Sequence, residues 1–200
     1  MRTQKVTNFA TLFLCIIMVA ASVLTGCTAK ETADTGNKPV VVYVADIFNT
    51  LNPYDTGAFS DSYVFNQVYE SLAKANDQGN AIPGLAKSWE ISADALTYTM
   101  KLVDNAVFHN GEKFKASDVV FTYNFAKGFA PKKAYYSMVK TVEVIDDYTV
   151  KFTLDKPYPL FLTYTQQVPI VNEKFVTEHK GDISKVASGT GPYKLVSYDP

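Results

Sequence analysis

Apolar and polar positions divide this 200-residue chain into three stretches of different character. A hydrophobic run extends from Phe9 to Leu24, and the polar segment 28–38 that follows has no apolar periodicity. From Pro39 onward, apolar residues recur with the periods of strands and helices. The pattern therefore predicts a leader, a flexible link and a globular domain that mixes strands and helices.

Alternation with a period of two and β-branched runs predict several strands in the globular part. These strands are expected at 40–45, 89–91, 96–102, 142–144 and 150–154. Asp146 and Asp147 separate the last two, which predicts a hairpin with both acids in its turn rather than a catalytic pair. The alternation also places Trp89, the only tryptophan, in a largely buried position.

Helical periodicity and capping residues predict the helices. The first is expected to begin at Ser60 or Asp61 and to extend to about Lys74. The second is expected to follow an N-cap at Ser117 and to end near Gly128. Together with the strands, these helices predict a mixed α/β fold.

The sequence Leu24-Thr25-Gly26-Cys27 ends the hydrophobic run and indicates where the protein resides. A positively charged start precedes the run, which is shorter than the roughly 20 residues of a membrane-spanning helix. The small residue before Cys27 suits cleavage at that point. We therefore expect a lipoprotein signal peptide at 1–26, lipid attachment at Cys27 and a flexible tether at 27–38. A chance cysteine after an ordinary signal peptide is the alternative.

Charge and cysteine content exclude several functions. Removing Arg2 and Lys5 with the leader leaves 17 of the 19 basic residues against 20 acidic ones, a net charge near −3. A nucleic-acid partner is not expected, because phosphate binding needs a basic face. Loss of Cys15 leaves Cys27 without a disulfide partner. Arg2 is the only arginine, so a ligand carboxylate would meet Lys or backbone N–H groups.

Groups suited to catalysis or metal binding are few. His109 and His179 are far apart in the sequence, so no Cys/His metal site and no cofactor is expected. His109, which precedes Asn110-Gly111, is interpreted as a turn residue rather than a ligand. Neither a Gly-x-Ser-x-Gly nor a His-Glu-x-x-His motif occurs, so we do not expect an enzyme. A secreted, lipid-anchored hydrolase is the alternative from another class.

A short helical piece within 171–180 precedes a glycine-containing loop at Ser188–Pro192. This loop leads into a predicted strand at 193–196. Such a loop could cradle an anion, but no Lys-Ser/Thr pair and no helix follow it, as a phosphate loop requires. The sequence therefore favours a structural turn.

Seven segments, in order along the chain, resemble one protein family. They are Leu51-Asn52-Pro53, Val68 to Leu72, Pro83 to Ser92, Tyr98 to Leu102, Phe108 to Phe114, Ala116 to Phe121 and Gly189 to Tyr193. Together they are similar to the family 5 solute-binding proteins of bacterial ABC importers, which include oligopeptide-, dipeptide- and nickel-binding proteins. The block from Gly84 to Val120 is the most specific part of this resemblance.

The resemblance implies a periplasmic-binding-protein fold with two lobes, of which this chain holds the first and lacks the second. It implies first-lobe parts at 39–55 and 165–200, with an inserted α/β subdomain at 56–164. From this half, the loop formed by Thr56, Gly57, Ala58 and Phe59 would line the ligand cleft. Such a loop can offer backbone groups to an extended peptide. Phe59 could equally pack beneath its own helix.

The implied function is that of a monomeric, lipid-anchored binding protein on the outer face of the cytoplasmic membrane or in the periplasm. It would capture short peptides, close its two lobes around them and deliver them to an ABC permease. A nickel chelate or another small solute is the alternative ligand.

Replacing Cys27 with Ala or Ser should move the protein from the membrane fraction to the soluble or secreted fraction, because acyl chains provide the anchor. Cell fractionation and labelling with radioactive palmitate test this prediction. Incorporation of palmitate into the variant would contradict it.

Overall fold

The computed structural model describes residues 50–58 and 60–199. The predictions for the signal peptide, Cys27, the tether, the strand at 40–45 and Phe59 lie outside these residues. Within the described part, no helix combines the length and the apolar character needed to cross a membrane. The described residues all belong to one compact unit.

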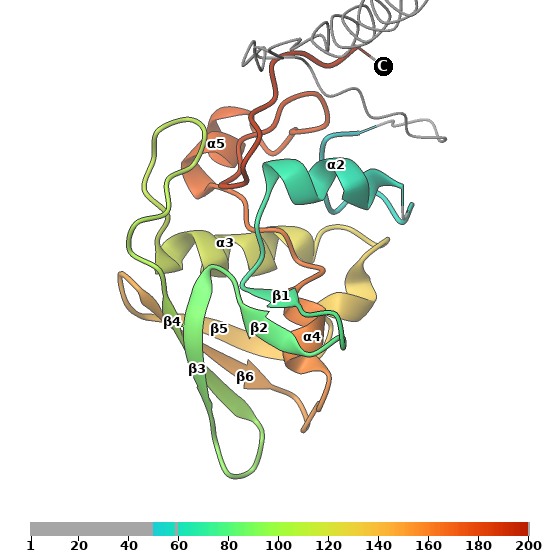
Figure 1. Ribbon diagram of the computed structural model, residues 1–200. Coiled ribbons are helices and arrows are strands. Elements are labelled where there is room, and N and C mark those ends of the chain that lie inside the picture. The colour runs from blue at the N-terminus through green and yellow to red at the C-terminus, as the bar shows by residue number, and fades with distance from the viewer. Residues whose placement is uncertain (1–49, 59, 200) are drawn as a thin grey trace, which may run out of the picture. The chain divides into compact units, whose positions relative to one another are not determined.

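A four-stranded antiparallel sheet with the order β3-β4-β6-β5 forms the centre of this unit (Figure 1). Its strands are β3 (Ala86–Ile91), β4 (Thr97–Leu102), β5 (Val139–Asp146) and β6 (Thr149–Leu154). A separate ribbon pairs β1 (Ala73–Ala75) with β2 (Ala81–Pro83). Strands β5 and β6 pair across a turn at Asp147 and Tyr148, so the predicted hairpin is confirmed. Asp146, which was also expected in the turn, is instead the last residue of β5 and pairs with Thr149.

The sheet has one apolar and one polar face, because neighbouring residues of a strand point to opposite sides. One apolar row across the four strands consists of Trp89, Met100, Val150 and Val144. The adjacent row on the other face consists of Glu90, Thr99, Lys151 and Glu143. Lys151 Nζ lies 2.5 Å from Glu143 Oε2 in that polar row. The apolar face must therefore be covered by other elements.

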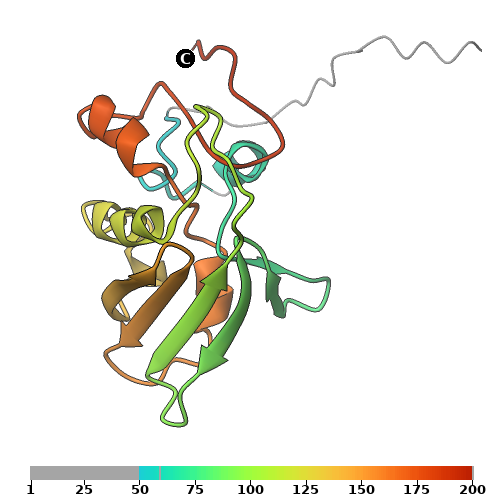
Figure 2. The ribbon, with the colours of Figure 1, turned by 90° about the vertical axis from the view of Figure 1, so that its left-hand side faces the viewer.

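Helix α3 (Ala116–Ala126) covers this apolar face, and α4 (Phe161–Thr165) packs beside it. Figures 1 and 2 show α3 between the sheet on one side and α5 (Glu173–Glu178) on the other. Helix α5 confirms the short helix expected within 171–180. The remaining helices are α2 (Asp61–Val68) and the 3-10 turn η1 (Lys133–Tyr135).

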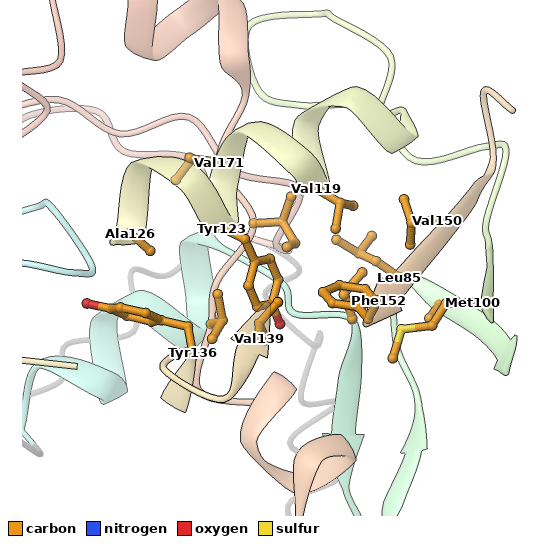
Figure 3. Packing of buried hydrophobic residues seen from close by; sticks show 14 of the residues in the cluster. Leu85, Met100, Val119, Tyr123, Ala126, Tyr136, Val139, Val150, Phe152 and Val171 are labelled. Atoms are coloured by element: carbon orange, nitrogen blue, oxygen red, sulfur yellow. The ribbon is translucent and has the colours of Figure 1, made fainter. Parts of the chain in front are cut away.

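Aromatic side chains join α3 and α4 to the sheet. Figure 3 shows Tyr123 of α3 directed toward Phe152 of β6, and the two ring centroids are 4.9 Å apart in an edge-to-face arrangement. Phe161 of α4 lies 5.3 Å from the Phe152 ring and 4.6 Å from the Tyr98 ring. Such pairs add about 0.5–1.5 kcal/mol each to the stabilisation from burial. Phe152 is therefore the point at which both helices meet the sheet.

Helix α2 ends at Val68, six residues before the predicted end at Lys74. Tyr69 is extended, with φ −115° and ψ 153°. The apolar periodicity nevertheless continues into Tyr69 and Leu72, both of which are buried. The prediction of the helix end was wrong because these residues meet the core from an extended chain, which periodicity alone does not distinguish.

The start of α3 also differs from the prediction. Its N-cap is Lys115 rather than Ser117, and the Lys115 N–H donates to Asp118 Oδ2 at 2.9 Å. The strand expected at 193–196 is absent from the described residues, where Val196 is 96% exposed. A strand needs a hydrogen-bonding partner, and local sequence does not supply one.

Trp89 packs against the core but is only partly buried, so the prediction of a largely buried side chain is confirmed in part. It faces the apolar side as predicted, but β3 is an edge strand that the covering helices do not fully shield. Ile91, two residues further along the same side, is 48% exposed. The alternation therefore gave the correct face but not the depth of burial.

Trp89→Ala should lower the free energy of unfolding by about 2 kcal/mol, less than the 3–5 kcal/mol of a buried tryptophan. Its cross-strand neighbour Met100 is fully buried, so Met100→Ala provides a matched comparison with an expected loss of about 2–5 kcal/mol. Urea denaturation measures both losses. A Trp89 fluorescence that iodide cannot quench would contradict the partial exposure.

Candidate functional site

The loop predicted to contact the ligand, residues 56–59, is called the contact loop below. It follows the segment 51–54, which is buried and held by hydrogen bonds. Leu51 and Tyr54 are each 1% exposed, and the Leu51 N–H donates to Ser184 O at 2.8 Å. The Tyr54 hydroxyl donates to Pro169 O. Asn52 Oδ1 accepts the Tyr54 N–H at 3.1 Å, which turns the chain toward the loop. The loop therefore begins at a fixed point.

Thr56 organises the loop itself. Its hydroxyl donates to Asp61 Oδ2 in the first turn of α2 and accepts the Ala58 N–H at 3.1 Å. Gly57 and Ala58 are exposed, and within the described part of the chain no hydrogen bond uses the Gly57 backbone. The loop thus has a rigid base and an accessible main chain. Phe59, the fourth predicted contact residue, lies outside the described residues.

A cation lies beside this loop. A methyl group on Gly57 would lie 4.0 Å from Pro131 Cβ, so the loop passes close to the Pro131–Lys132 turn. Lys132 Nζ is 5.6 Å from the centroid of the Phe65 ring on α2. Burial lowers the pKa of the Lys132 ammonium, and the Asp61 carboxylate acts in the opposite direction. Sequence reasoning did not identify Lys132, because no motif marks it.

A cavity of about 570 Å³ opens between α2, the β1 region and the segment 166–169. Its polar lining includes Asn66, Glu70, Lys74, Lys132 and Gln166. Glu70 Oε1 accepts from Lys74 Nζ at 2.8 Å, so these two charges compensate each other. This cavity adjoins the loop through Lys132 and is large enough for a small ligand.

A second hollow, of about 630 Å³, lies at the N-terminal ends of α3 and α5. The Asp118 carboxylate in this hollow is already hydrogen-bonded within the protein. Its Oδ1 accepts from Asn172 Nδ2 at 3.0 Å and from the Glu173 N–H at 2.9 Å. Burial raises the pKa of Asp118, while these donors act in the opposite direction. Lys174 pairs with Glu112 at 2.5 Å. The polar groups of this hollow therefore join two helix ends.

The glycine-containing loop packs against the C-terminal end of α2. A Cβ on Gly189 would lie 2.0 Å from Val68 O, and one on Gly191 would lie 2.5 Å from Gln67 O. The Gly191 N–H donates to Val68 O at 2.9 Å. Helix carbonyls repel anions. The structure therefore supports the structural turn rather than the anion cradle.

His109 contacts the glycine-containing loop 188–192 on the side opposite α2. Its Nδ1 accepts the Gly189 N–H at 3.3 Å, so Nε2 carries the proton and donates to Gly191 O at 2.8 Å. His109 lies in a turn as predicted, where the Gly111 N–H donates to Phe108 O at 2.8 Å. The sequence did not reveal the contact with the glycine loop, whose residues lie about 80 positions later.

His179 packs against Phe175, with 4.3 Å between ring centroids, and its Nδ1 lies 2.8 Å from Phe175 O. Across residues 50–58 and 60–199, no three His, Cys, Asp or Glu side chains gather as a metal site.

The chain is similar to known bacterial solute-binding proteins. Residues 80–200 match the family described as bacterial extracellular solute-binding proteins, family 5 Middle. The glutathione-binding protein GsiB of Pectobacterium atrosepticum is 30% identical over 184 residues, which cover 88% of this chain and 36% of that protein. The chain thus spans about a third of the length of this relative.

Solved structures share the fold of this chain. NikZ from Campylobacter jejuni, in complex with Ni(L-His), is 32% identical with a TM-score of 0.68 over 78% of this chain and 32% of NikZ. AppA from Bacillus subtilis, in complex with a nonapeptide, has a TM-score of 0.70 at 22% identity over 78% of this chain and 33% of AppA. These neighbours are two-lobe periplasmic binding proteins.

Gly189→Ala should lower the free energy of unfolding by about 3 kcal/mol or more, because the methyl group would collide with the Val68 carbonyl. Gly57→Ala is the matched control, since its methyl group would meet only Pro131 Cβ at 4.0 Å. The control should change stability by less than about 0.5 kcal/mol. Equal losses in urea denaturation would contradict the close approach.

Proposed function

This chain belongs to the family 5 bacterial extracellular solute-binding proteins, and we propose that it is the lipid-anchored, extracytoplasmic binding component of an ABC importer. In this proposal it captures short peptides and delivers them to the permease. It performs no catalysis and acts as a monomer. Cys27 carries the lipid, and the segment 27–38 separates the domain from the membrane.

The accessible backbone of the contact loop carries this proposal. Gly57 and Ala58 are exposed above a base that Thr56 and Asp61 hold by hydrogen bonding. An extended peptide can pair with such a main chain, which recognises the peptide backbone and leaves its side chains largely unread. The peptide bound to AppA supports this ligand class. GsiB and NikZ support glutathione and a nickel chelate as the alternatives.

The proposed mechanism is closure of two lobes around the ligand. Residues 39–55 and 165–200 would belong to the first lobe, and 56–164 would be its inserted subdomain. The hydrogen bond from Leu51 to Ser184 supports joining the two first-lobe parts. The second lobe would come from sequence outside this chain. A ligand that contacts both lobes stabilises the closed state over the open one.

Thr56→Ala in the full native protein that carries this sequence should weaken peptide binding about tenfold, because the loop loses its bond to Asp61. Thr99→Ala is the matched control, since Thr99 lies on the polar face of the sheet. Calorimetry with di- to pentapeptides measures both affinities. If the unmodified protein binds no peptide but binds glutathione or Ni(L-His), the ligand class is wrong and the binding role stands. If it binds none of these, the proposed function is wrong.

A further inference from the structure

Lys132 occupies a position from which it can reach a ligand on the contact loop. It directly follows Pro131, which neighbours Gly57, and it lines the cavity of about 570 Å³ beside α2. The Phe65 ring, with its centroid 5.6 Å from Nζ, attracts the ammonium and limits its movement. Among the described residues, no hydrogen bond or ion pair uses this ammonium, so it can donate to a ligand.

The Lys132 ammonium has no counter-ion within salt-bridge distance in the described part of the chain. No described carboxylate oxygen lies within 4.0 Å of Nζ, whereas Lys74, the other lysine of the cavity, pairs with Glu70 at 2.8 Å. Asp61 influences Lys132 electrostatically, but its Oδ2 accepts the Thr56 hydroxyl. A half-buried ammonium without a partner is costly, and an incoming anion would remove this cost.

We propose that the Lys132 ammonium binds a carboxylate of the captured ligand, so that this protein prefers peptides with an acidic side chain or a free C-terminus over peptides without a carboxylate. This inference rests on the proposed peptide-binding function. Gly57 and Pro131 are neighbours, so one extended ligand can pair with the loop backbone and reach Lys132 with a carboxylate. Charge-assisted hydrogen bonds from N–H to carboxylate are about twice as strong as neutral ones.

The test compares Lys132→Gln with Lys133→Gln in the full native protein. Lys133 is the adjacent, exposed lysine, so its variant removes the same charge outside the cavity lining. The probes are Ala-Glu-Ala and Ala-Gln-Ala, each with a free and an amidated C-terminus, titrated by calorimetry. Lys132→Gln should weaken binding of carboxylate-bearing peptides about 10- to 100-fold and change binding of the Ala-Gln-Ala amide, which has no carboxylate, less than twofold. Lys132→Arg should retain the preference.

Two results would overturn the inference: no effect of Lys132→Gln, or an equal loss for peptides with and without a carboxylate. Either leaves peptide binding by the unmodified protein intact, so the proposed function survives. If the unmodified protein binds no peptide, the anion contact is tested without a peptide. The lysines are labelled by ¹³C-methylation, and the protein is titrated with glutarate while their NMR signals are recorded. The Lys132 signal, assigned by its absence from Lys132→Gln, should shift saturably while that of Lys133 does not. Absence of such a shift would falsify the proposed anion contact.

Discussion

The position of helix α2 depends on backbone approaches that leave no room for a side chain. Gly189 and Gly191 bring the 188–192 loop against the carbonyls at the C-terminal end of the helix, and His109 holds both glycines from the opposite side. The N-terminal end of the same helix carries Asp61, which fixes Thr56 and with it the contact loop. Helix α2 is therefore held by the 188–192 loop at one end and supports the contact loop at the other.

Segments distant in sequence meet around this helix. The Ile170 N–H donates to Glu70 O at 2.8 Å, and Ser71 Oγ donates to Gln166 O at 2.9 Å. Each such bond contributes only about 0.5–1.5 kcal/mol, but leaving a buried partner unpaired costs about 1–3 kcal/mol. The arrangement is therefore favoured as a whole, because displacement of one segment would leave buried groups of the others unpaired. This explains how a loop with an exposed backbone can have a rigid base.

The sequence predicted those features that depend on neighbouring residues. Period-two alternation gave the sheet faces and the hairpin at Asp146, and the ordered family segments gave a family membership that is confirmed. Features set by distant contacts were not predicted: α2 ends at Val68, Trp89 keeps part of its surface exposed, and residues 193–196 form no strand. Lys132 and the second role of His109 carry no local signal, since only folding brings them to Phe65 and Gly189.

The absence of arginine from the described part of the chain restricts how this surface can recognise a ligand. A guanidinium binds a carboxylate through two fixed parallel bonds, whereas an ammonium acts as a compact charge whose donors rotate. The proposed site combines exposed backbone at Gly57, which carries no information about side chains, with one ammonium at Lys132. Such a surface recognises the direction of the ligand's main chain and its charge, but it does not distinguish the ligand's side chains by shape. In the proposed two-lobe mechanism, discrimination by ligand size must then come from the opposing lobe.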